Sequence, residues 1–182
     1  ENFDLVGAKT KISATPLSED LIEKGVILAD INTAFEKHPI AQNYFFKNAK
    51  IDKDKFLALS AAYFTNGIFL YIPKNIEIGE PIRVNFNFDG QNSILHNLII
   101  AEPNSKVDFI EEYTNKELSQ EQLNCCVTEV FANQASKINF YHINSWTGNL
   151  YNFTSIAGAL GRDSTINWIS GCFGGKLNRL KI

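Results

Sequence analysis

A five-residue pattern recurs three times in the second half of the chain. Residues 105–109 read SKVDF, residues 136–140 read SKINF and residues 164–168 read STINW. The aliphatic centres of the last two copies follow their predecessors by 31 and 28 positions. A unit of about 30 residues with more than one strand cannot bury its apolar face alone, whereas stacked copies bury it between them. The repeat therefore predicts a stack of parallel β-coils.

A second strand precedes each copy of the pattern, and the two are joined by a short turn rich in Asn, Gly and Pro. The expected strands are residues 97–101, 126–131 and 151–156, and the turns are residues 102–104, 132–134 and 160–163. A weaker, earlier copy surrounds Ile76. An antiparallel sandwich would also give strands at regular spacing. It would not need the same short string three times, so stacked coils are favoured.

The predicted fold is mainly β: a right-handed parallel β-helix preceded by a small helical N-terminal region. Residues 1–66 form the predicted N-terminal extended and helical region, with helical spacing over most of residues 16–66 and a break at Pro39. Residues 67–182 form the predicted β-helix core. The strand pattern is still running at Ile182, and the chain starts at Glu1 without any Met. We therefore expect a fragment whose core is truncated at its C-terminal end.

Composition excludes several classes of function. The net charge of −3 and the pI of about 5.6 give no electrostatic case for binding nucleic acid or an anionic membrane surface. No stretch approaches the roughly 18 apolar residues that span a bilayer. Neighbouring residues of a strand face opposite sides, so Cys125 and Cys126 should not pair with each other. With Cys172, the chain has an odd number of cysteines, which favours free thiols in a reducing cytoplasm.

Two residues are weak candidates for a metal site. His142 and Cys172 lie in or near predicted strands, and imidazole and thiolate are suitable metal ligands. No CxxC or HxxxH spacing accompanies them, so ordinary strand residues are the favoured interpretation. The Cys125–Cys126 pair invites a redox interpretation, although free cysteines are common small core residues. His38 and His96 have no obvious partners and are expected to be structural.

Four carboxylates offer an alternative, enzymatic interpretation. If Asp108, Glu111, Glu112 and Glu129 lined one face of the coils, they would resemble the acid pairs or calcium sites of β-helical carbohydrate-active enzymes. Charges at strand ends are more often solvated, which is the favoured interpretation. No Ser/His/Asp arrangement with a nucleophile elbow is present, and no GxxxxGK[ST] loop for ATP. We therefore predict no catalytic residue and no enzymatic activity.

Three segments together resemble the SufB/SufD family of iron–sulfur cluster assembly proteins. Residues 55–74 (KFLALSAAYFTNGIFLYIPK) are similar to the helix, turn and strand that open the family core. Residues 144–146 (NSW) with 149–152 (NLYN), and residues 168–171 (WISG) with 174–176 (GGK), resemble the next coils. The resemblance implies a right-handed β-helix flanked by helices. It also implies a subunit of the SUF complex, in which SufB and SufD associate through their β-helices and clusters are built near that contact.

The resemblance favours the SufD side of the family. SufB-like members carry Gly-Cys-Ser/Thr-Ala-Pro where residues 111–115 here read EEYTN. The main cluster-related Cys and His of the family, and its ATPase-docking helices, lie beyond the position of Ile182. No cofactor-binding residue is therefore carried over, and any iron–sulfur cluster is expected to be assembled by the full complex.

The resemblance also implies partners and a compartment. The partners are a SufB-like paralogue and a SufC-like ATPase, and self-association into a homodimer through the edge of the last coil is also expected. The expected compartment is the cytoplasm, or a plastid in a eukaryote. The expected role is that of a scaffold, with a β-helical carbohydrate-active enzyme or a purely structural binding module as the alternatives.

Overall fold

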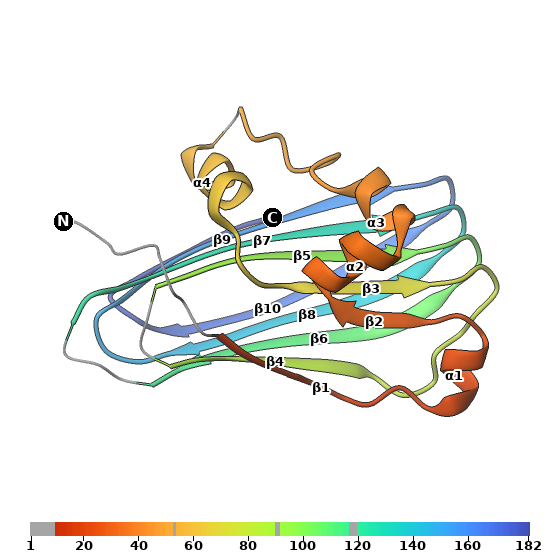
Figure 1. Ribbon diagram of the computed structural model, residues 1–182, viewed down its shortest axis with the longest axis horizontal. Helices are drawn as coiled ribbons and strands as arrows, with labels where there is room; N and C mark the ends of the chain where they lie inside the picture. The colour runs from red at the N-terminus through yellow and green to blue at the C-terminus, as the bar shows by residue number, and fades with distance from the viewer. Residues whose placement is uncertain (1–9, 53, 90–91, 117–119) are drawn as a thin grey trace.

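The computed structural model describes residues 10–182 except 53, 90–91 and 117–119, and it forms a parallel β-solenoid with helices along one side (Figure 1). The elements follow in the order β1 (Thr10–Ala14), α1 (Glu19–Glu23), β2 (Ile27–Asp30), α2 (Ile31–Lys37), α3 (Pro39–Tyr44), α4 (Lys55–Tyr63), β3 (Ile68–Ile72), β4 (Ile82–Phe88), β5 (Ser93–Ala101), β6 (Lys106–Asn115), β7 (Gln122–Ala132), β8 (Lys137–Trp146), β9 (Leu150–Leu160), β10 (Thr165–Gly174) and β11 (Leu177–Lys181).

The chain alternates between two sheets. One has the order β1-β4-β6-β8-β10 and the other β11-β9-β7-β5-β3-β2. From β3 onward, each step along the chain crosses to the other sheet. From β5 onward, each strand pairs in parallel with the strand one coil earlier. β1 and β2 pair antiparallel to their neighbours at the first end of the stack. The prediction of a parallel β-helix is confirmed, and the antiparallel sandwich is excluded.

The repeated pattern stacks in register. Val107 lies opposite Ile138, which lies opposite Ile166, in the ladder β6-β8-β10. The aromatic residues two positions later also stack, with ring centroids 5.4 Å apart for Phe109–Phe140 and 5.1 Å apart for Phe140–Trp168. The first two residues of the aliphatic column are fully buried inside the coil. The spacing of the repeat is therefore the length of one coil.

The turns explain why each copy of the pattern starts with serine. The Ser105, Ser136 and Ser164 hydroxyls donate to the carbonyl oxygens of Glu102, Asn133 and Gly161 at 2.6, 2.7 and 2.8 Å. The residue before each serine has a left-handed backbone, with φ values of 59°, 55° and 59° at Asn104, Ala135 and Asp163. Asn75, with φ 62°, fills the same place in the earlier, weaker copy. Asn and Asp tolerate this conformation better than most residues, so the residue type suits the turn at Asn75, Asn104 and Asp163 but not at Ala135.

The helices α2, α3 and α4 of the N-terminal region cover the outer face of the strands β3, β5 and β7 (Figure 1). The break at Pro39 is confirmed, because α2 ends at Lys37 and α3 begins at Pro39. The helical prediction is wrong for residues 27–30, which form β2 and pair with β3. These four residues are a short apolar run, and their pairing with β3 makes them a strand rather than part of a helix. β2 lies before the predicted boundary at residues 66 and 67, and it pairs with β3, which lies after it. The division of the chain into two regions at this boundary stays a prediction.

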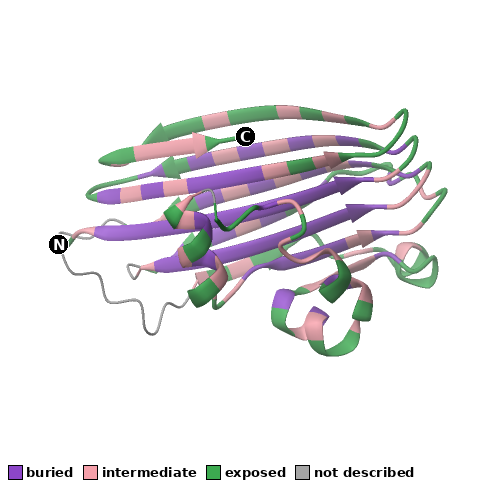
Figure 2. Ribbon diagram, turned by 90° about the horizontal axis from the view of Figure 1, so that it is seen from above, coloured by how far each residue is buried: buried purple, intermediate pink, exposed green. Residues whose placement is uncertain are grey.

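Burial differs along the stack. β5 and β7 are buried along their whole length because the coil interior lies on one side and the N-terminal region covers much of the other (Figure 2). β10 and β11, at the far end, keep many exposed positions (Figure 2). Residues 1–9, which include part of the predicted extended segment, lie outside the described residues. No helix in the described part of the chain is long and apolar enough to cross a membrane.

Candidate functional site

The interior of the coils changes from apolar to polar along its length. In β6 and β8 the inward-facing positions begin with the apolar repeat and continue with Glu111 and His142, which lie opposite each other in the ladder. Further buried polar residues face them from the same and the opposite sheet: Asn97, Asn124, Thr128, Asn144, Asn152 and Thr154. Buried polar groups are costly unless they are hydrogen-bonded, so this half of the interior is a candidate site.

Glu111 and His142 form a buried acid–imidazole pair. His142 Nδ1 lies 2.6 Å from Glu111 Oε1 and donates to it. The other carboxylate oxygen accepts from Tyr113 Oη at 3.0 Å and from Asn97 Nδ2 at 3.3 Å. Both side chains of the pair are 1% exposed or less. The carboxylate is thus satisfied on both oxygens, and it fixes the orientation of the imidazole ring.

Cys172 of β10 lies on the far side of the imidazole. It is opposite Asn144 in the β8-β10 ladder. Asn144 Nδ2 is 3.1 Å from His142 Nε2 and 3.5 Å from Cys172 Sγ, so one amide holds both groups. Asn144 Oδ1 accepts from Asn178 Nδ2 of β11 at 2.8 Å, which fixes the amide in turn. Acid, imidazole and thiol therefore follow one another across three neighbouring strands.

The surroundings shift the pKa values of the imidazole and the thiol in opposite directions. Burial works against the charged imidazolium, but hydrogen bonds and attraction from Cys172 and Glu111 outweigh it and raise the pKa of His142 to about 9. The hydrogen bond from His142 lowers the pKa of the Cys172 thiol, against the opposing effect of burial. Both shifts act in the direction of proton transfer from the thiol to the imidazole.

The structure brings the two predicted metal candidates, His142 and Cys172, into contact. Among the described residues, no group of three or more His, Cys, Asp or Glu side chains is arranged to hold a metal ion. The metal role stays a prediction. Glu111 and Asn144 complete the site and were not singled out as its members from the sequence. Glu111 and His142 each lie four positions after an aliphatic residue of the repeat, and this equal offset is the signal that places them together.

The four carboxylates do not share one face. Glu111 lies inside the coil, whereas Glu129 lies on the outer side of the opposite sheet, under the N-terminal region. Asp108 accepts from Asn139 Nδ2 at 2.6 Å, and Glu112 pairs with Arg83 at 2.9 Å. The prediction that these charges are solvated is wrong for Glu111 and Glu129, which are fully buried. Alternation along β6 places Glu111 and Glu112 on opposite faces, so a shared acidic surface is not formed.

Glu129 and His96 form a second buried pair. His96 Nε2 lies 3.1 Å from Glu129 Oε2. The carboxylate also accepts from the backbone N–H groups of Phe46, Asn48 and Ala49 at 2.6, 2.8 and 2.9 Å. The expectation that His96 has no partner is therefore wrong. This pair attaches residues 46–49 to the outer face of β5 and β7.

The other two cysteines are free and buried, as expected. Burial raises the pKa of Cys125 to about 12, and it also raises the pKa of Cys126. Cys126 Sγ lies 3.4 Å from Tyr113 Oη, within the polar interior. Both thiols are held in the protonated, unreactive form, which favours the core interpretation over the redox one.

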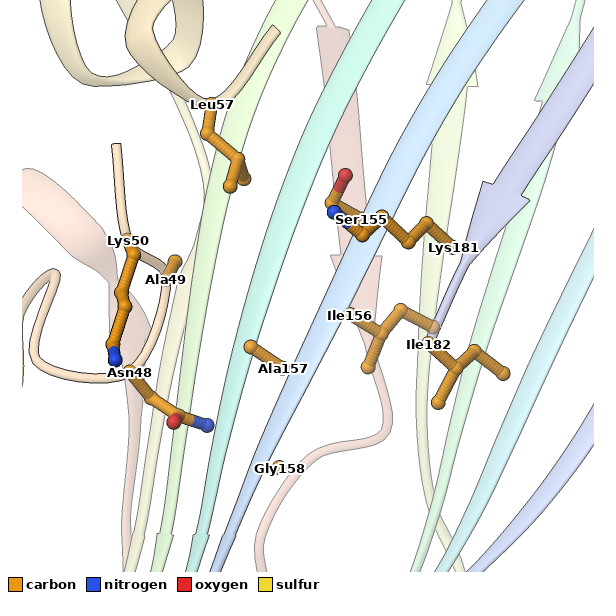
Figure 3. A pocket seen from close by; sticks show the side chains of 10 residues that line it. All are labelled: Asn48, Ala49, Lys50, Leu57, Ser155, Ile156, Ala157, Gly158, Lys181 and Ile182. Atoms are coloured by element: carbon orange, nitrogen blue, oxygen red, sulfur yellow. The ribbon is translucent and has the colours of Figure 1, made fainter. Parts of the chain in front are cut away.

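A groove of about 340 Å³ lies outside the coils, between the segment before α4 and the strands β9 and β11 (Figure 3). Its floor is apolar, with Leu57 and Ala157, and Lys50 and Lys181 stand on opposite sides of it (Figure 3). The remaining lining residues are Asn48, Ala49, Ser155, Ile156, Gly158 and Ile182. The lining holds no carboxylate, imidazole or thiol side chain, so the groove offers apolar and cationic contacts but no acid–base pair.

Comparison with known proteins places this architecture in a family. The family model for the "SUF system FeS cluster assembly, SufBD core domain" matches residues 85–182. The model for the "SufBD protein N-terminal region" matches residues 10–84. The two matches together run through both the helical cover and the solenoid.

Individual relatives agree with these matches. The "Iron-sulfur cluster assembly protein SufD" of Bacillus subtilis (strain 168) is 32% identical over 160 residues, which are 85% of this chain and 37% of the relative. An "Iron-sulfur cluster assembly SufBD family protein" of Staphylococcus epidermidis (strain ATCC 12228 / FDA PCI 1200) is 27% identical over 164 residues, which are 88% of this chain and 35% of the relative. The chain thus spans about a third of the length of these relatives. It belongs to the SufB/SufD family of the SUF iron–sulfur cluster assembly system, and it is SufD-like.

Proposed function

We propose that this chain acts as a scaffold within a SUF complex, together with a SufB-like paralogue and a SufC-like ATPase. The observation that carries the proposal is the agreement between the stacked coils and the family matches, which run from residue 10 to residue 182. The chain would support cluster assembly by holding partners in place, without turning over a substrate itself. Iron and sulfur would be the cargo of the complex rather than a resident cofactor of this chain.

A carbohydrate-active enzyme has less support. Such an enzyme needs paired carboxylates about 5–10 Å apart that face the substrate. Here Glu111 and Glu129 are buried in different places, and Glu112 is engaged with Arg83. A purely structural binding module remains the second candidate, and the partner experiment separates it from the scaffold.

Co-expression with the two partners from the same genome tests the proposal. The tagged full-length protein should retain the SufB-like and SufC-like proteins through affinity purification and size-exclusion chromatography. Full-length protein that purifies without either partner would overturn the scaffold proposal.

A further inference from the structure

Residues 45–49 link α3 to the segment before α4 and lie on the outer face of β7 as neither helix nor strand. We call these five residues the strap. The backbone N–H groups of Phe46, Asn48 and Ala49 donate to one carboxylate, that of Glu129, at 2.6, 2.8 and 2.9 Å. Among the described residues, no backbone–backbone hydrogen bond joins the strap to a strand. Its polar attachment to the sheet is therefore a single side chain.

The closed strap holds one residue in a strained backbone conformation. Phe46 has a φ of 50°, in the left-handed region that bulky side chains rarely adopt. Such a conformation persists only where the surrounding contacts impose it. Here the imposing contacts are the hydrogen bond from the Phe46 N–H group to Glu129 and the packing of the Phe46 ring on His96, with ring centroids 4.4 Å apart. Opening the strap would release this strain.

The ring of His96 lies under the strap with one nitrogen unpaired. Its Nε2 is 3.1 Å from Glu129 Oε2, whereas its Nδ1 has no hydrogen-bond partner among the described residues. The rings of Phe45, Phe46 and Phe64 lie against it, with centroids 4.2, 4.4 and 5.9 Å away. Protonation would give Nδ1 a buried proton without an acceptor, which is costly. Because two of the three covering rings belong to the strap, opening the strap would give this proton access to water.

We propose that the strap is a conformational device: it opens as one unit while the solenoid stays folded, and protonation of His96 releases it. Opening uncovers Val127 and Leu57, which pack with Ala49 in the closed form. The proposal rests on contacts within the chain's own cover and does not depend on the scaffold role. Loss of partner binding would leave it intact, and a strap that never opens would leave the scaffold proposal intact.

The titratable groups around the ring set the direction of the pH effect. Glu129 of β7 faces the ring, Ile94 and Leu98 are its neighbours on the same face of β5, and Lys47 of the strap is exposed. Burial outweighs Glu129 and lowers the pKa of His96. Burial raises the pKa of Glu129, but hydrogen bonds from His96 and from the strap outweigh it and lower this pKa. Each group therefore binds its proton more tightly in the open form, so a falling pH favours opening, and the ring acts first, below about pH 6.5.

Native-state hydrogen exchange, followed by NMR, tests the proposal. At each pH, the exchange rates of the Phe46, Asn48 and Ala49 amides are divided by those of an unstructured chain, which gives the opening equilibrium constant. The three amides should share one constant, at least about tenfold larger than that of Val130 in β7, with little dependence on denaturant. Between pH 7.5 and 5.5, this constant should rise about fivefold as the ring takes up its second proton.

Two variants assign the pH effect. His96→Gln keeps an N–H donor for Glu129 but has no ring to protonate, so its opening constant should stay the same across this pH range. Lys47→Ala is the control, because it removes an exposed charge of the strap and should keep the parent profile. Strap amides that exchange only together with β7 in the parent protein would overturn the proposal, whatever the variants do. A parent opening constant that does not change with pH would overturn the release by His96, and the parent profile decides this even if His96→Gln does not fold.

Discussion

The molecule contains two buried histidine–glutamate pairs, and the pKa of the histidine is shifted in opposite directions in the two. Inside the coils, His142 pairs with Glu111, and on the outer face His96 pairs with Glu129. Both pairs are excluded from water. The pKa of His142 is raised to about 9, because Cys172 and Glu111 outweigh the effect of burial. The pKa of His96 is lowered, because burial outweighs the effect of Glu129.

The hydrogen-bond partners of the two carboxylates explain why the pKa values of the two histidines shift in opposite directions. Glu129 receives three backbone N–H groups, so its charge is stabilised without a charged imidazole. The rings of Phe45, Phe46 and Phe64 surround His96, and its Nδ1 has no hydrogen-bond partner among the described residues. A neutral ring that donates from Nε2 fits these surroundings. A buried histidine beside a carboxylate is therefore not charged by default; the other neighbours decide.

Glu129→Gln is expected to have the largest effect. Each oxygen of Glu129 accepts from at least one backbone N–H, so either orientation of the glutamine amide places its NH₂ against a donor. The cost should be about 3 kcal/mol in the free energy of unfolding, because buried donors lose their acceptor. Residues 46–49 should also exchange their amide hydrogens faster. Denaturant unfolding and hydrogen exchange measure the two effects.

Glu112→Gln is the matched control for that variant. Glu112 pairs with Arg83 at the surface, where ion pairs contribute less than about 1 kcal/mol. If both variants unfold at the same denaturant concentration, the outer pair does not attach the N-terminal region as described.

Glu111→Gln should cost less, about 1–2 kcal/mol. The glutamine oxygen can still accept from Tyr113, and its NH₂ can donate to His142 Nδ1 once the ring changes tautomer. Glu129→Gln cannot adjust in this way, because the backbone N–H groups that face the carboxylate are donors only and cannot accept a hydrogen bond from the new NH₂ group. Nitrogen-15 chemical shifts of the ring would report the tautomer. A loss as large as that of Glu129→Gln would show that the two pairs are equally rigid.

The pH dependence of stability should also separate the two pairs. The raised pKa of His142 gives stability that is complete below about pH 6.5 and is lost as the pH rises through about 9. The lowered pKa of His96 acts in the opposite sense: stability is present above about pH 6.5 and is lost as the pH falls below it. The ring signals of the two histidines should therefore titrate in different ranges by NMR.

A single titration range shared by both rings would contradict the comparison. Replacing His142 with Asn should remove only the loss on the alkaline side, and replacing His96 with Asn only the loss on the acid side. Denaturant unfolding of both variants across the pH range checks the assignment.

Most of the fold was predictable because the spacing of the repeat equals the number of residues in one coil. Three copies of a short string set the register of Val107, Ile138 and Ile166, and that register fixed the stack. The antiparallel β2 was not predictable, because a four-residue strand carries no period of its own and depends on β3 for its pairing. Long-range pairing decided its structure, rather than local preference.

The candidate site was predictable only in part. His142 and Cys172 were singled out by residue type, but their spacing of 30 positions matched no ligand motif. They meet because that spacing is close to one coil. Glu129 could not be placed, because its partners are backbone N–H groups of residues 46–49, which no side-chain pattern announces.

The antiparallel strands β1 and β2 give the stack a direction. β1 pairs with β4 and β2 pairs with β3, and both pairs run against the parallel ladders. The first parallel strand of each sheet is therefore covered by a strand of the opposite sense rather than left as an open edge. A further coil of the same repeat could not stack on this end in parallel register, so the two antiparallel strands cap the stack as terminal repeats cap other solenoids.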